Sequence, residues 1–188
     1  MPAIDLRPGF CVFVIVLAAL DRGGSMLPVL GAMALHELAH ILAMLALGGR
    51  IRGMTLRFAD LRIAAVGLSY RQELLAALAG PAMNLLCAVA LSRQQPEFAA
   101  YSLILGGYNL LPVWPLDGGR AVQCALLEHL PPTQAERCAD TIGAAVCGVL
   151  LLAGVWLCLI KRIGMWPLGM AAYLLLRLLL LGKRERNA

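Results

Sequence analysis

Charged side chains are scarce in this 188-residue sequence. Asp, Glu, Lys and Arg make up 14% of it, while hydrophobic residues make up 61% and the mean hydropathy is +0.79. A soluble domain typically has about 25% charged and about 45–50% apolar residues, so this composition excludes an ordinary soluble globule. It predicts an all-α integral membrane protein, and the length fits a single domain over residues 1–188.

Signals for disulfides and for nucleic-acid binding are also missing. None of the six cysteines stands in a CxxC pair, and four lie in apolar runs, so we interpret them as small buried hydrophobes rather than as a disulfide framework. The 16 Lys and Arg residues are spread over several loops and form no single basic patch. No nucleic-acid partner is therefore expected.

What the sequence does have is a series of long apolar runs. A bilayer core needs about 20 apolar residues per helix, which gives six candidate spans. They cover residues 8–20, 26–48, 73–91, 98–115, 141–160 and 163–181. The first resembles a signal peptide, but no convincing cleavage site follows it, so we retain it as a span. More basic residues lie in the loops on the side of the termini, which predicts a multi-pass cell membrane protein with both termini cytoplasmic.

Two of the three histidines interrupt one of these apolar runs. The segment ALHELAH places His36 and His40 four residues apart, with Glu37 beside the first. Residues four apart share one face of a helix, about 6 Å apart along its axis, so two imidazoles there can hold one tetrahedral zinc ion. Glu37 would then reach a water on the metal. Because polar groups inside a span are expensive, this pattern favours zinc over two histidines merely hydrogen-bonded within a bundle.

A catalytic zinc site usually takes a third protein ligand. Asp117, in the segment NLLPVWPLDGGR, is the preferred candidate because two prolines and two glycines break the helix around it. Such a break at membrane depth is tolerated only where it is buried or lines a cavity. The alternative role for Asp117 is the N-cap of a helix over 118–130, which is compatible with ligation. His129 is the weaker candidate, because it lies about 18 Å further on if that stretch is helical.

Three motifs resemble those of the site-2 protease family of intramembrane zinc metalloproteases, peptidase family M50. They are HELAH, AGPAMN at 79–84, and NLLPVWPLDGGR. The resemblance implies that His36, His40 and Asp117 bind one zinc ion per chain. It also implies that Glu37 is the catalytic acid and base.

The resemblance carries weaker implications for two asparagines. It marks Asn84 and Asn109 as polar residues that contact the substrate or the oxyanion. Ala39 stands where many relatives carry glycine, and we expect this small residue still to pack tightly. The six-span layout is most similar to the bacterial branch that includes the stage IV sporulation protein FB, and no CBS domain is expected.

This family resemblance implies a function and a partner. The protein is expected to hydrolyse a peptide bond in or near a transmembrane segment of a membrane-protein substrate, as in regulated intramembrane proteolysis, with a further membrane protein as regulatory partner. The alternatives are a zinc-binding, non-proteolytic membrane regulator and a metal transporter. Retention of Glu37 argues against the regulator, and the lack of a matched pair of broken helices argues against the transporter.

The segment between the second and third expected spans has a different pattern. MTLRFADLRIAAVGLS, residues 54–69, alternates apolar and basic residues around Ala59 and Asp60. Period-two alternation predicts a small β-hairpin at the cytoplasmic interface, with an edge strand to which a substrate segment can pair. The alternative is a plain interfacial loop whose arginines extend toward water.

Overall fold

The computed structural model describes residues 3–6, 19, 21, 24, 26–57, 60–160, 169 and 171–176. These residues divide into two compact units, Met1–Tyr108 and Asn109–Ala188. The expected spans 8–20 and 163–181 lie mostly outside the described residues. The expectation of a single domain stays a prediction.

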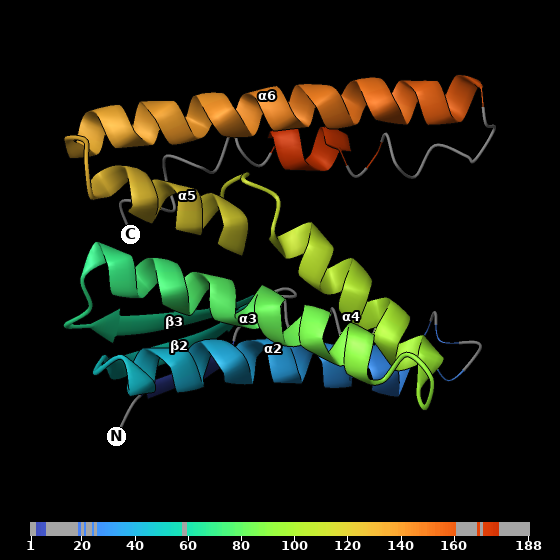
Figure 1. The fold of residues 1–188 in the computed structure, drawn as a ribbon, viewed down its shortest axis with the longest axis horizontal. Helices are drawn as coiled ribbons and strands as arrows, with labels where there is room; N and C mark the ends of the chain where they lie inside the picture. Colours follow the sequence, from blue (N-terminus) through green and yellow to red (C-terminus); the bar gives the residue numbers. More distant parts are fainter. Residues whose placement is uncertain are drawn as a thin grey trace. The chain divides into compact units, whose positions relative to one another are not determined.

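The described residues of the first unit form a small sheet and three helices (Figure 1). Its strands are β1 (Ala3–Leu6), β2 (Arg50–Arg57) and β3 (Asp60–Val66), and its helices are α2 (Met26–Ala46), α3 (Tyr70–Ala90) and α4 (Pro96–Asn109, whose last residue falls at the unit boundary). β2 pairs antiparallel with β3, with Arg57 opposite Asp60, while β1 runs parallel to β2. The antiparallel pair predicted between the second and third spans is therefore present in the fold. Its position at a membrane interface stays a prediction.

Helix α2 ends in a glycine turn that leads into the sheet. Gly48 has φ +86°, its N–H donates to the Leu45 carbonyl at 3.0 Å, and the Gly49 N–H donates to the Met44 carbonyl at 2.9 Å. This is a Schellman motif, in which a left-handed residue satisfies the last free carbonyls of a helix. Glycine is favoured at position 48 because a side chain is strained at positive φ.

Helix α3 is anchored to the end of α2 at its first turn. Ser69 and Gln72 form a capping box, in which the Gln72 Oε1 accepts from the Ser69 N–H at 2.9 Å. The Gln72 Nε2 also donates to the Leu47 carbonyl at 3.1 Å, across 25 residues of sequence. Met44 and Ala76 form the buried centre between the two helices, with Ile41, Leu47, Ile51 and Leu68 packed around them. This contact fixes the registry of α2 against α3, on which the site below depends.

The second unit contains α5 (Asp117–Leu127), which packs against the long helix α6 (Pro132–Leu159) (Figure 1). A non-helical segment, residues 110–116, precedes α5 and includes Pro112 and Pro115. The expected span 98–115 is therefore wrong at its end, because the helix stops at Asn109. At 1.5 Å per residue the 14 residues of α4 extend about 21 Å, less than the ~30 Å of a bilayer core.

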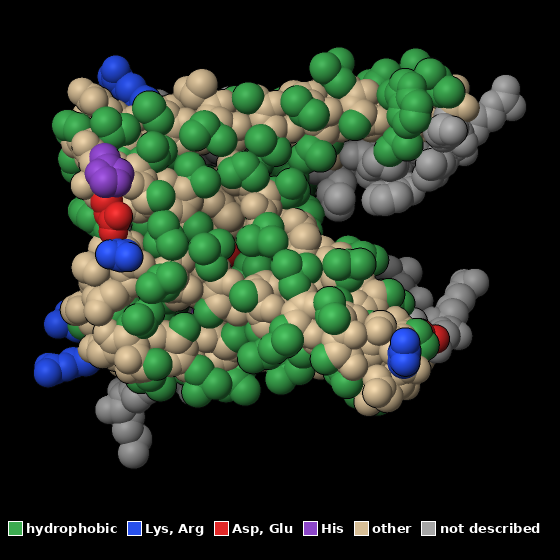
Figure 2. All heavy atoms as spheres, in the orientation of Figure 1, with side chains coloured by type: hydrophobic (Ala, Val, Ile, Leu, Met, Phe, Trp, Pro, Cys, Tyr) green, Lys and Arg blue, Asp and Glu red, His purple; other side chains and the backbone are tan. Residues whose placement is uncertain are grey.

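Three of the described helices are long and apolar enough to cross a membrane: α2, α3 and α6. Large hydrophobic side chains on them are exposed, including Leu27 at 80%, Val89 at 78% and Leu152 at 73%. Figure 2 shows hydrophobic side chains distributed along the visible face of α6. Apolar side chains on the outer surface of a helix bundle suit contact with lipid rather than with water.

Candidate metal centre

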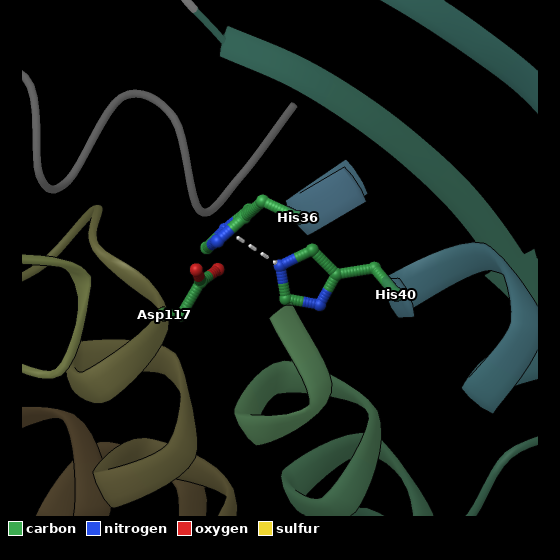
Figure 3. Close-up of side chains that lie close together, drawn as sticks. All are labelled: His36, His40 and Asp117. Atoms are coloured by element: carbon green, nitrogen blue, oxygen red, sulfur yellow. Dashed lines mark hydrogen bonds between the residues drawn. The ribbon is translucent and has the colours of Figure 1, made fainter. Parts of the chain in front are cut away.

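Helix α2 brings His36 and His40 together, as their spacing predicts. Both imidazoles are buried, at 4% and 6% exposure. Their ring centroids lie 4.7 Å apart at an interplanar angle of 81°, and the two Nε2 atoms are 3.1 Å apart (Figure 3). Ala39, between them in sequence, is buried as expected for a small residue on this face. Two ring nitrogens that converge in this way are suited to share one metal ion.

A backbone atom of α3 determines which nitrogen of His40 faces this pair. The His40 Nδ1 lies 2.7 Å from the carbonyl oxygen of Ala76. A carbonyl oxygen only accepts hydrogen bonds, so the neutral ring carries its proton on Nδ1 and leaves a lone pair on Nε2. His40 is thus held in the tautomer that a metal requires when it binds through Nε2.

The AGPAMN motif supplies the surface of α3 against which both rings lie. Gly80 is buried, and a Cβ placed on it would clash with the His40 Nε2 and would lie 2.8 Å from the His36 Nε2. No side chain larger than hydrogen fits there without displacing the histidines. The AGPAMN motif includes Gly80, but the sequence pattern assigned no role to Gly80 and did not indicate Ala76. A glycine at the centre of an apolar helix was the available signal for such a close approach.

Asn84, one turn further along α3, contacts His36. It is fully buried, and its Nδ2 lies 3.1 Å from the His36 Nδ1. Its Oδ1 is also buried and has no hydrogen-bond partner among the described residues. On the other side of Asn84 the backbone of α4 comes close at Gly106, where an added Cβ would lie 3.0 Å from the Asn84 Cβ. The side chain is therefore enclosed between α2 and α4.

Asp117 lies in the second unit as the first residue of α5, and its side chain is half-buried. The N-cap residue is Leu116, so the expectation that Asp117 itself caps a helix beginning at 118 is wrong by one position. Gly118 and Gly119 are buried against the preceding segment, where a Cβ on Gly118 would lie 2.6 Å from the Leu111 carbonyl oxygen. The tight packing explains the two glycines after the aspartate: the chain turns back on itself before the helix begins.

The remaining candidates occupy different settings. Glu37 is half-buried beside His36 on α2, and Asn109 is half-buried at the end of α4. His129 is exposed in the turn that follows α5. The structure thus brings together His36, His40 and Asn84 within the first unit. The metal-binding, catalytic and substrate roles of all these residues stay predictions.

The sequence was compared with protein families and with known proteins. The family model described as Peptidase family M50 matches residues 97–150, a stretch that contains Asn109 and Asp117. A zinc metalloprotease from Methanocaldococcus jannaschii is 24% identical over 176 residues, and the match covers 81% of this chain and 51% of that protein. The chain thus spans about half the length of that curated relative.

The fold has a solved counterpart. The site-2 protease from Methanocaldococcus jannaschii superposes with a TM-score of 0.67 at 20% identity, covering 93% of this chain and 88% of that chain. The chain therefore has the fold of a site-2 protease. The three matches are thus to a family M50 model, to a zinc metalloprotease and to a site-2 protease.

Proposed function

We propose that the chain is a member of peptidase family M50. In this proposal it acts as an intramembrane zinc metalloendopeptidase, hydrolysing a peptide bond in or near a transmembrane segment of a membrane-bound substrate. The observation that carries the proposal is the pair of buried imidazoles on α2, whose Nε2 atoms lie 3.1 Å apart and one of which is fixed as a metal-binding tautomer by Ala76. A buried histidine pair on an apolar helix is expensive unless something such as a metal compensates for it.

The proposed ligands of the zinc ion are His36, His40 and Asp117, which Figure 3 draws as sticks. Two imidazoles and one carboxylate form a donor set typical of catalytic zinc, which keeps a further position open for water. Leu116, not Asp117, occupies the N-cap position of α5. The proposal therefore does not require the Asp117 carboxylate to cap the helix as well as to bind zinc. When bound, zinc lowers the pKa of its water to about 7 and polarises a peptide carbonyl.

Glu37 performs the proton transfers in this proposal. It follows His36 directly on α2, so its carboxylate projects from the face adjacent to that of the two histidines. A half-buried carboxylate in this position accepts a proton from the attacking water and donates it to the leaving amine. A site that only bound metal for structural reasons would have no use for it.

Substrate binding is proposed to involve the sheet and the end of α4. β3 pairs with β2 along one edge, and among the described strands no other pairs with its second edge. A substrate segment unwound from its helix can add to such an edge through backbone hydrogen bonds. Asn109, at the end of α4, is the candidate donor to the oxyanion of the tetrahedral intermediate.

We also propose a membrane topology of six spans with both termini in the cytoplasm. We further propose that the protein acts in regulated intramembrane proteolysis with a membrane regulatory partner, and that it belongs to the branch of the stage IV sporulation protein FB. Labelling of single cysteines introduced at residues 50–57 and at Ala188 tests the orientation. Both positions should react only from the cytoplasmic side, and an extracytoplasmic C-terminus would contradict the six-span count.

The experiment that tests the function is a comparison of wild type with Glu37→Gln, purified in detergent. The wild type should contain one zinc ion per chain and cleave a membrane substrate. The Gln variant should keep the zinc and lose cleavage, since its side chain has a similar shape but cannot accept the proton. Near-normal cleavage by the variant would contradict the assigned role of Glu37. Zinc binding by the wild type without cleavage would instead favour a regulator, and zinc flux in vesicles a transporter.

A further inference from the structure

The side-chain amide of Asn84 is buried, and only one of its two polar atoms has a hydrogen-bond partner among the described residues. Its Nδ2 lies 3.1 Å from the His36 Nδ1, while its Oδ1 is buried without a hydrogen-bond partner among the described residues. Buried polar side-chain atoms are normally paired, so an unpaired amide oxygen beside a proposed metal ligand needs an explanation.

His40 donates its Nδ1–H to Ala76, so its Nε2 carries a lone pair and can bind a metal ion. The Nε2 of His36 lies 3.1 Å from this atom, so both rings turn the same nitrogen toward the proposed zinc ion. The other ring nitrogen of His36, Nδ1, faces the amide of Asn84 at 3.1 Å.

Binding of zinc through the His36 Nε2 requires that nitrogen to carry a lone pair. The proton must then lie on Nδ1, and this N–H needs an acceptor. The unpaired Oδ1 of Asn84 is an acceptor on the same side chain, and rotation of the amide about its terminal torsion exchanges Oδ1 for Nδ2. The packing of Gly106 against the Asn84 Cβ holds the stem of the side chain while the amide turns.

We propose that Asn84 is a positioning residue for the metal centre. Its Oδ1 accepts from the Nδ1–H of His36 when zinc is bound through the Nε2 of that ring. This inference rests on the proposed zinc site and deepens it. Asn84 contacts the edge of the ring that faces away from Nε2, so it acts through His36 and not on the substrate. The family resemblance implies a different role for Asn84, contact with the substrate or the oxyanion, which stays a prediction.

Two substitutions of Asn84 separate this role from simple packing. Asn84→Leu keeps the approximate shape and removes the acceptor, whereas Asn84→Asp keeps both the shape and an acceptor oxygen. Zinc affinity, measured by competition with a chelator, should fall about 10- to 100-fold in the Leu variant. It should stay within a few-fold of wild type in the Asp variant. Equal affinities of the two variants would overturn the proposal.

The chemical shift of the His36 Nδ1–H proton provides a second readout that does not depend on activity. In the full-length protein with Zn²⁺ bound, this proton should be shifted downfield by its hydrogen bond to Asn84, and the shift should be lost in Asn84→Leu and kept in Asn84→Asp. A His36 Nδ1–H signal that is unchanged in Asn84→Leu would overturn the inference even if zinc binds. A wild type that binds no zinc would instead refute the proposed function itself, so the two failures are distinguishable.

Discussion

The Nδ1–H of His40 donates to the carbonyl oxygen of Ala76 at 2.7 Å. A side chain of α2 is thereby oriented by the backbone of α3, and side-chain substitution at position 76 cannot remove that acceptor. The geometry of the histidine pair therefore depends on how closely α3 approaches α2. That approach is made by Gly80, whose backbone lies against both rings.

The first prediction concerns this approach. Gly80→Ala introduces a Cβ that would lie 2.7 Å from the His40 Cε1 and 2.8 Å from the His36 Nε2, so at least one ring must move. Zinc affinity should fall by at least about tenfold, because misplaced ligands lose metal binding. Competition with a chelator measures the change.

A matched control for this substitution is Gly107→Ala. Gly107 is helical and exposed, and no described atom lies within 4 Å of the Cβ that alanine would add there. Its zinc affinity should equal that of wild type. Unchanged affinity in Gly80→Ala as well would show that α3 does not determine the positions of the rings.

Hydropathy alone predicted two helices, α2 and α3, closely, and two others, α4 and α6, only in part. The expected spans 26–48 and 73–91 correspond to α2 and α3 within a few residues. Helix α6 begins at Pro132, nine residues before the expected span at 141. Its first turns contain Glu136 and Arg137. These charged residues fit a helix but interrupt an apolar run, so a search for apolar membrane spans misses this part of α6.

The parts that the sequence could not predict depend on contacts between distant residues. The four residues of β1 show no pattern of their own, and their pairing with β2 joins positions about 50 residues apart. Asn84 and His36 are 48 residues apart, so no local pattern relates them. By contrast the histidine pair lies within one helical turn, where spacing alone determines the geometry.

A second prediction concerns the anchoring of α3. Ser69→Ala removes the side-chain acceptor of the Gln72 N–H and breaks the capping box. The variant should unfold with a free energy lower by about 1 kcal/mol, as is typical for the loss of an N-cap. Chemical unfolding in detergent measures this difference.

Ser92→Ala serves as the control for the capping prediction. The Ser92 hydroxyl is exposed and donates to the Val89 carbonyl at 3.0 Å, so the residue type and setting match but no helix N-terminus is involved. The free energy of unfolding should change by less than about 0.5 kcal/mol. Equal losses in the two variants would contradict a capping role for Ser69.

A third prediction concerns the turn before α5. Gly118→Ala places a Cβ against the carbonyl groups of Leu110 and Leu111, which belong to the backbone and cannot rotate away. The segment 110–116 must then shift, and with it the start of the helix at Asp117. The variant should have a lower unfolding temperature than wild type. Gly148→Ala, on α6 with no described atom within 4 Å of the added Cβ, should not. Similar unfolding temperatures for both variants would show that the turn is not tightly constrained.

The last prediction concerns the third zinc ligand. Asp117 opens α5 directly after a segment broken by two prolines, and its carboxylate is half-buried. His129 is exposed in the turn beyond the other end of the same helix. The 11 residues of α5 extend about 16 Å, so the two side chains cannot occupy the same coordination position without rearrangement of the helix.

Asp117→Ala should therefore lose most of its bound zinc and all proteolysis, while His129→Ala should lose neither. Zinc content per chain, measured on both purified variants and on wild type, decides between the two residues. Asp117→Asn is a closer variant: it keeps the size of the side chain but replaces the anionic ligand with a neutral amide, which binds zinc more weakly. Its zinc content should fall between those of wild type and the Ala variant. Zinc retained by Asp117→Ala and lost from His129→Ala would reverse the assignment. It would also require the turn after α5, and not its first residue, to lie at the metal.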